Sequence, residues 1–159
     1  MKEIQLSQGK VALVDDEDFE ELSQFKWCAV KYGNIFYAIR NCPNPKTGKK
    51  TTITMHRQIL GLTDPKEQTD HVDGNGLNNQ RSNIRVCNKQ QNGANRSAQK
   101  NNPLGFKGVS LFRGGKFRAQ IQVLRKNIHL GLFKTPELAA AAYDAAALKY
   151  YGEFARTNF

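Results

Sequence analysis

The last third of the chain restricts the possible folds most, because its apolar pattern changes there from the period of strands to that of a helix. Strands are predicted over 108–112, 117–123 and 127–132, with turns at Gly114-Gly115 and near Arg125-Lys126. A helix should begin at Thr135-Pro136-Glu137, which combines a capping threonine, proline at the first helical position and an acidic first turn. This Ala-rich helix should run to about Tyr150 and stop at Gly152. The residues expected to pack it against the sheet are Leu138, Ala141, Ala142, Ala145, Ala146 and Leu148.

Residues 1–55 have the pattern of a small α+β unit. Strands are predicted over 3–6, 10–14, 27–30, 35–40 and 51–54, with turns at Gly33 and over 46–50. Asp15-Asp16 can cap a helix from about Glu17 to Phe25, because acidic residues are favourable at the positive end of a helix. The aromatic residues are expected to form the core rather than a ligand site: Phe19, Phe25, Trp27, Phe36 and Tyr37.

The middle of the chain is rich in asparagine. One or two helical turns are expected over 56–60 before Gly61, then an ordered polar loop over 74–83 and a strand over 83–86. Asn88 can cap a helix running to about Lys100, and a short linker is expected over 97–104. Nine asparagines fall between Asn75 and Asn102, so the alternative is a low-complexity polar tract. The strand pattern and the ligand-like spacings argue against that alternative.

The charge distribution indicates the class of partner, and the cysteine content indicates the cellular compartment. The net charge is +1 over 1–55, +3 over 56–102 and +6 over 103–159, within a total of +10. This gradient favours a polyanionic partner at the C-terminal end over a merely solvated basic surface. Three widely spaced cysteines without a Cys-x-x-Cys pair argue against a disulfide framework and a zinc ribbon. Together with the lack of a signal peptide or membrane span, they predict a soluble cytoplasmic or otherwise intracellular protein.

Asp70-His71 is the most informative pair for function. Cutting a phosphodiester requires an activated water, a cation near the scissile phosphate and stabilisation of the leaving oxygen. His71 has the ordinary pKa of a general base near neutrality, and Asp70 would point to the opposite face of an extended segment. Asn92 could bring an amide oxygen to the same metal, and Arg96 on that helix could contact a phosphate. Oxygen ligands of this kind suit Mg²⁺ or Mn²⁺ better than zinc.

The arrangement of these residues resembles the HNH endonuclease ββα-metal motif. The matching stretches are Asp70-His71-Val72-Asp73-Gly74-Asn75, Asn78, Asn83-Ile84-Arg85 and Gln91-Asn92-Gly93-Ala94-Asn95. The upstream segment from Met55 to Leu60 is similar to the segment that precedes this motif in phage and intron-encoded homing endonucleases. Residues 1–55 also resemble the N-terminal region of that group, through Ile4, Leu6, Gly9, Val14-Asp15 and Trp27.

The resemblance implies a role for each of four residues. His71 matches the general base, Asp70 a metal ligand, Asn83 the asparagine that braces the loop and the histidine, and Asn92 the metal ligand of the helix. Many family members have histidine at this last position, and an amide oxygen is a weaker ligand that a homing subgroup shares. Of the other histidines, we expect His56 to pack or hydrogen-bond locally at a helix start, and His129 to be half-buried structure in a strand.

Five segments of the C-terminal stretch carry a recognisable pattern: Phe106–Ser110, Gly115–Ile121, Leu130–Phe133, Ala139–Ala146 and Asn158-Phe159. Over nearly its whole length this stretch resembles the Apetala/ethylene-response-factor DNA-binding domain. The resemblance implies a three-stranded antiparallel sheet that lies in the DNA major groove, with one helix packed behind it. The chain departs from the plant pattern at Ser110, Phe117 and Gln122, so the base sequence that the plant factors bind is not transferred.

Alternation independently gives the sheet one polar and one apolar face. Arg118, Gln120 and Gln122 share one face, while Phe117, Ala119, Ile121 and Val123 share the other. Six residues are expected to line the two longer strands and contact DNA: Arg113, Lys116, Arg118, Gln120, Gln122 and Arg125. Arg96, on the preceding helix, is the seventh expected DNA contact.

The sequence thus predicts an α+β protein with three parts: an N-terminal α+β region over 1–55, an HNH motif over 56–100 and a DNA-binding domain over 101–159. The leading hypothesis is a site-specific, metal-dependent HNH homing endonuclease, phage- or intron-encoded, acting as a monomer on an asymmetric double-stranded DNA site. The principal alternative is a non-cleaving DNA-binding regulator with a degenerate HNH scaffold. RNA binding is a third possibility, disfavoured because the aromatic residues of the sheet do not join its polar face. The sequence does not determine the target DNA sequence. It also does not determine whether one or both strands are cut, or whether Mg²⁺ or Mn²⁺ is preferred.

Overall fold

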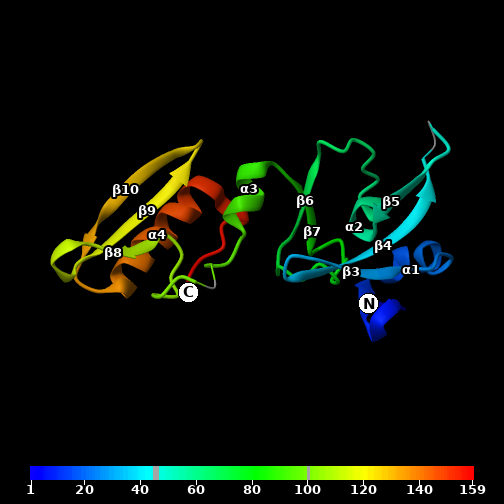
Figure 1. The fold of residues 1–159 in the computed structure, drawn as a ribbon, viewed down its shortest axis with the longest axis horizontal. Helices are drawn as coiled ribbons and strands as arrows, with labels where there is room; N and C mark the ends of the chain where they lie inside the picture. Colours follow the sequence, from blue (N-terminus) through cyan, green and yellow to red (C-terminus); the bar gives the residue numbers. More distant parts are fainter. Residues whose placement is uncertain (45–46, 100) are drawn as a thin grey trace. The chain divides into compact units, whose positions relative to one another are not determined.

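The chain forms two compact units in a computed structural model that describes residues 1–44, 47–99 and 101–159. The first unit is Met1–Asn88 and the second is Lys89–Phe159 (Figure 1). Helices and strands occur in both, which confirms the predicted α+β class. The division into three parts at 55 and 100 stays a prediction. Lys46, where one turn was expected to begin, and Lys100, where a helix was expected to end, lie outside the described residues.

Short antiparallel pairings build the first unit. Strand β1 (Lys2–Gln5) pairs with β2 (Val11–Val14), and helix α1 (Asp16–Ser23) follows. Strands β3 (Cys28–Tyr32), β4 (Ile35–Pro43) and β5 (Lys50–Thr54) form an antiparallel sheet in that order. Gly33 turns the chain between β3 and β4 with a φ of +61°, which suits glycine. Helix α2 (Met55–Ile59) then leads to the hairpin of β6 (Gln68–His71) and β7 (Ile84–Cys87).

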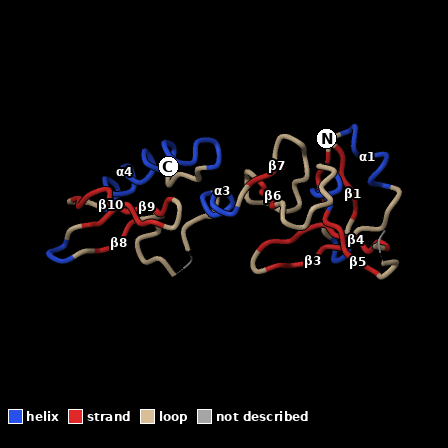
Figure 2. Tube along the Cα trace, turned by 90° about the horizontal axis from the view of Figure 1, so that it is seen from above, coloured by secondary structure: helices blue, strands red, loops and turns tan. Residues whose placement is uncertain are grey.

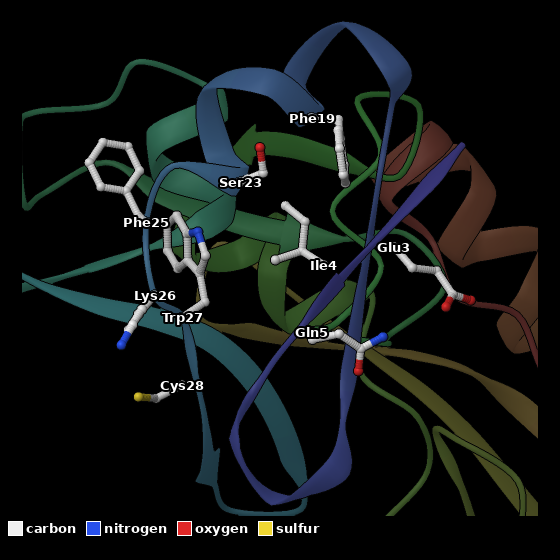
Figure 3. A pocket seen from close by; sticks show the side chains of 9 residues that line it. All are labelled: Glu3, Ile4, Gln5, Phe19, Ser23, Phe25, Lys26, Trp27 and Cys28. Carbon is white, nitrogen blue, oxygen red and sulfur yellow. The ribbon is translucent and has the colours of Figure 1, made fainter.

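The core of the first unit only partly follows the aromatic prediction. Trp27 is buried and donates its indole N–H to the carbonyl of Leu22 at 2.8 Å. Phe25 is instead exposed, and the guanidinium of Arg40 lies 3.9 Å from the centre of its ring, a cation–π contact that does not require burial. Both aromatic residues line a surface pocket between β1, α1 and the start of β3 (Figure 3).

Asp15 departs from its predicted capping role. It occupies the N-cap position of α1, but its side chain makes no capping hydrogen bond. The carboxylate instead accepts from the backbone N–H of Arg81 at 2.7 Å and from the side chain of Gln80 at 3.2 Å. The start of α1 is thereby tied to the loop that precedes β7.

The second unit is a three-stranded sheet packed on one helix. Helix α3 (Lys89–Ala94) precedes β8 (Val109–Leu111), β9 (Phe117–Val123) and β10 (Lys126–Phe133), which pair antiparallel in the order β10-β9-β8. Helix α4 (Pro136–Tyr151) packs along this sheet (Figure 2). The side chain of Thr135 accepts a hydrogen bond from the N–H of Leu138 at 3.3 Å, as its predicted capping role requires.

Two helical predictions were wrong in detail. The helix after Asn88 ends at Ala94 rather than near Lys100, because the carbonyl of Ala94 accepts from the backbone N–H of Arg156 at 3.2 Å and from the ammonium of Lys107. Four of the six residues expected to pack α4 on the sheet are exposed: Leu138, Ala141, Ala145 and Leu148. The buried face carries Ala139, Ala140, Tyr143, Asp144, Ala146 and Ala147. Because this helix is apolar nearly all round, its sequence period could not select the face.

Candidate active site and nucleic-acid interface

The β6–β7 hairpin fixes the position of Asp70. Its register places Asp70 opposite Arg85, whose guanidinium contacts the same carboxylate oxygen through its terminal nitrogen at 2.9 Å and through Nε at 3.3 Å. Asp70 is buried, with 8% of its surface exposed. A carboxylate so far removed from water needs a charged partner, and Arg85 supplies it.

His71 ends the same strand and is also buried, with 6% of its surface exposed. Its Nε2 lies 3.5 Å from the side-chain oxygen of Asn79, a long hydrogen bond. Burial lowers the pKa of His71, and the hydrogen bond with Asn79 and the charges of Asp73 and Asp70 only partly oppose it. The imidazole is therefore uncharged at neutral pH and can accept a proton.

Asn83 braces the loop between β6 and β7. Its side-chain N–H₂ donates to a carboxylate oxygen of Asp73 at 3.0 Å and to the carbonyl of Asn78 at 2.8 Å. Its side-chain oxygen accepts from the backbone N–H of Asp73 at 3.0 Å. One buried amide thus closes the loop directly after His71.

Two further loop residues were not singled out by the sequence. Asp73 also accepts from the backbone N–H of Asn75 at 2.7 Å and from the side chain of Asn78 at 2.8 Å. Burial raises the pKa of Asp73, but these hydrogen bonds and the one from Asn83 outweigh it, so the net shift is downward. Asn79 is fully buried, and its backbone N–H donates to the carbonyl of Leu13 at 2.8 Å, which anchors the loop on β2. A signal for Asp73 existed, since it lies inside the Asp70–Asn75 run.

The rings of His56 and Tyr37 lie beside His71. The ring of His56 lies edge-to-face with it, with centroids 4.9 Å apart and planes at 88°. Tyr37 lies 5.8 Å from His71 and 5.9 Å from His56 by the same measure. As expected, His56 packs at a helix start and hydrogen-bonds locally, to Thr54. The sequence did not indicate that it touches His71.

Asn92 and Arg96 belong to the second unit. Asn92 lies on α3 and is half-buried, and the exposed Arg96 follows that helix. Asp70, His71 and Asn83 belong to the first unit. A joint metal site of Asp70 and Asn92 therefore stays a prediction.

The donor atoms present suit a hard cation rather than zinc. No cluster of three or more His, Cys, Asp or Glu side chains that could hold a metal occurs within 1–44, 47–99 and 101–159. A magnesium ion in nuclease-type sites needs only one or two carboxylates, with water and substrate phosphate completing the shell. Asp70 offers one such carboxylate, one oxygen of which contacts Arg85, and carboxylate oxygens are donors of the kind that Mg²⁺ and Mn²⁺ prefer.

The sheet of the second unit has one polar and one apolar face, as alternation predicts. Ala119 and Ile121 are buried against α4, while Arg118 and Gln120 are half-buried and Gln122 is exposed. The side-chain oxygen of Ser110 and Nε of Arg118 are buried without a hydrogen-bond partner, and the register pairs these two residues. The polar face thus retains unused hydrogen-bonding groups.

Three of the residues expected to line the two longer strands do not lie on strands. Arg113 is in a 3-10 turn (Arg113–Gly115), Lys116 follows that turn and Arg125 is in the turn between β9 and β10. Arg113 and Arg125 lie in the turns that flank β9, where Gly114, Gly115 and Arg125 itself have positive φ. His129 is exposed, not half-buried as expected, and it lies opposite Gln120 in the register, which adds it to the polar face.

Comparison with known proteins gives two kinds of relative, while no protein-family model matches the chain. An uncharacterized HNH endonuclease of Acanthamoeba polyphaga mimivirus is 28% identical over 155 residues, which covers 94% of this chain and 75% of the relative. APETALA2-like protein 2 of Oryza sativa subsp. indica is 38% identical over 78 residues, or 48% of this chain and 17% of the relative. The ethylene-responsive transcription factor ERN1 of Medicago truncatula is 39% identical over 85 residues, or 52% of this chain and 32% of the relative. The chain therefore spans most of the viral relative and only a minor part of each plant protein.

Two further findings concern membrane-spanning helices and the cysteines. Within the described part of the chain, no helix has the length and apolar character needed to cross a bilayer. Cys28, Cys42 and Cys87 are free thiols, as expected from their spacing.

Proposed function

We propose that this protein is a site-specific, metal-dependent HNH homing endonuclease that hydrolyses DNA phosphodiester bonds. The observation that carries the proposal is the buried Asp70-His71 pair at the end of β6, with an uncharged imidazole beside an asparagine-braced loop. The similarity to a viral HNH endonuclease over 94% of the chain supports the same function.

In this proposal His71 is the general base. Its burial keeps the imidazole uncharged, so that it can take a proton from the attacking water at neutral pH. The hydrogen bond with Asn79 and the brace formed by Asn83 restrict the ring and the loop that follows it. Arg85 contacts the carboxylate of Asp70 at 2.9 Å and fixes its position in the hairpin.

Asp70 and Asn92 would hold the divalent ion. When bound, such an ion supplies positive charge beside the scissile phosphate and the leaving oxygen. Asp70 offers the stronger ligand, and the amide of Asn92 is weaker. We therefore expect low intrinsic metal affinity and a requirement for millimolar rather than micromolar Mg²⁺ or Mn²⁺.

The second unit would select the DNA. Its sheet presents Arg118, Gln120 and Gln122 on one face, and Arg and Gln side chains form bidentate hydrogen bonds with base edges in the major groove. The basic residues in the turns at the ends of this sheet and after α3 would bind phosphates: Arg96, Arg113, Lys116 and Arg125. The similarity to plant APETALA2-like and ethylene-responsive proteins supports this assignment.

Incubation with a supercoiled DNA library tests the proposal. The native protein and His71→Ala are compared with Mg²⁺ and with EDTA, and DNA binding is measured in parallel by gel shift. Metal-dependent nicked or linear product that disappears in the variant supports the endonuclease. Tight duplex binding without cleavage by either protein would favour the non-cleaving DNA-binding regulator over the endonuclease. A preference for RNA over DNA at matched salt would contradict both of these functions and favour RNA binding.

A further inference from the structure

His56 has a position that its local role does not explain. It is the second residue of α2, with 7% of its surface exposed, and its ring is the one closest to His71 among the aromatic contacts of the described chain. The centroid separation of 4.9 Å at 88° is an edge-to-face packing, which favours one relative orientation of the two rings. Tyr37 contacts both rings and completes a three-ring group in the first unit.

Stability does not account for a histidine at this position. Its Nε2 lies 3.0 Å from the hydroxyl of Thr54, but its Nδ1 is buried without a hydrogen-bond partner. A buried polar atom in that state has lost its hydrogen bonds to water without gaining one in the protein, which destabilises the fold. A phenylalanine would fill a similar volume without that cost. A destabilising residue in contact with the proposed base is therefore a candidate for a functional role.

The uncharged state of His56 matters for its neighbour. Burial lowers the pKa of His56 to about 3, and the proximity of His71 and Arg57 adds to the effect. At neutral pH the ring therefore brings an aromatic surface, and no positive charge, to His71.

We propose that His56 is a positioning residue of the nuclease site, whose ring fixes the orientation of the His71 imidazole through the edge-to-face contact. This inference rests on the proposed endonuclease function and extends it by a residue outside the Asp70–Asn92 motif. The ring of His56, together with that of Tyr37, leaves His71 one packed orientation from which to accept the proton of the attacking water. His56 itself does not touch the substrate in this account.

Two substitutions separate the ring from its nitrogens. His56→Phe keeps an aromatic ring and removes both nitrogens, whereas His56→Ala removes the ring. We expect His56→Ala to lower the single-turnover cleavage rate at saturating DNA about tenfold or more, with the Kd for DNA unchanged, because misplacing a reacting group acts on the chemical step. His56→Phe should cleave at close to the native rate and be at least as stable as the native protein.

A matched control addresses loss of stability alone. Ile59 is buried on the same helix, and Ile59→Ala opens a cavity there. We expect this variant to be less stable but to cleave at the native rate per folded molecule. His56→Leu, which fills the volume without an aromatic ring, repeats the comparison should the alanine variant not fold.

The inference is overturned by a His56→Ala or His56→Leu variant that cleaves at the native rate, or by a His56→Phe variant as slow as the alanine one. An NMR measurement keeps this outcome separate from failure of the proposed function. Nuclear Overhauser contacts between the rings of His71 and Tyr37 should persist in His56→Phe and be lost or averaged in His56→Ala. If the two variants show these differences in ring contacts but the native protein cleaves no DNA, the endonuclease function is refuted while the packing of His71 by His56 still holds. Unchanged ring contacts in His56→Ala refute the positioning role.

Discussion

Replacing Asn83 with alanine removes the brace of the loop that follows His71. The side chain makes three hydrogen bonds, two with Asp73 and one with the carbonyl of Asn78. Each contributes about 0.5–1.5 kcal/mol net, and the exposed Asp73 can return its polar groups to water in the variant. We therefore expect Asn83→Ala to lower the free energy of unfolding of the first unit by about 2 kcal/mol.

The single tryptophan of the chain makes this measurement specific to one unit. Trp27 is buried in the core of the first unit, so its fluorescence during urea unfolding does not report on the second. With a slope of about 1 kcal/mol per molar urea, the expected loss lowers the midpoint by about 2 M. Asn41→Ala, at an exposed position of β4, is the control and should change the free energy of unfolding by less than about 0.5 kcal/mol. An Asn83→Ala midpoint as high as that of the control would show that the loop does not depend on this brace.

Three further predictions concern stability. The folded-state pKa values of His56 and His71 lie below the ordinary 6.5. The first unit therefore has its full free energy of unfolding above pH 6.5, and loses part of it as the pH decreases toward the folded-state pKa values. With a folded pKa of about 3, His56 alone should cost the first unit about 3 kcal/mol at pH 4.5, visible by tryptophan fluorescence as a lower urea midpoint than at pH 7.5; equal midpoints would contradict it. Gly108→Ala should destabilise the second unit by about 3 kcal/mol in thermal unfolding followed by circular dichroism, since φ is +75° and a Cβ would lie 2.0 Å from the ring of Tyr143; an unchanged melting temperature would refute this close approach. Thr135→Ala should cost about 1 kcal/mol in the same assay while Thr135→Ser costs little, and equal losses would argue against the capping hydrogen bond.

Much of the fold follows from local sequence signals. The three strands and the helix of the second unit were predicted within one or two residues, because alternation, turn glycines and the Thr135-Pro136 start agree with one another. The buried face of α4 was missed because alanine is nearly continuous along it, and tertiary packing alone selects a side. The early end of α3 depends on Lys107 and Arg156, which are distant in sequence and carry no local signal of that contact.

The candidate site likewise contains residues that the sequence predicted and residues that it did not. Asp70, His71 and Asn83 lie close in sequence, and their placement on the β6–β7 hairpin and its loop follows from strand pairing. Long-range packing, in contrast, brings His56 and Tyr37 to His71 from α2 and β4. No periodicity in the chain indicates that three rings from separate elements will meet, which is why His56 was expected only to pack locally.

Single-turnover cleavage of a bound DNA fragment tests the central claim most directly. A duplex that the protein binds is selected from a random library, and the native protein and His71→Ala are compared on it at saturating protein with Mg²⁺. The account predicts strand cleavage by the native protein, loss of at least about 100-fold in rate in the variant, and the same Kd for both. Equal cleavage by the two proteins, or none by the native protein at full occupancy, would contradict the assignment of His71 as the base of a DNA endonuclease.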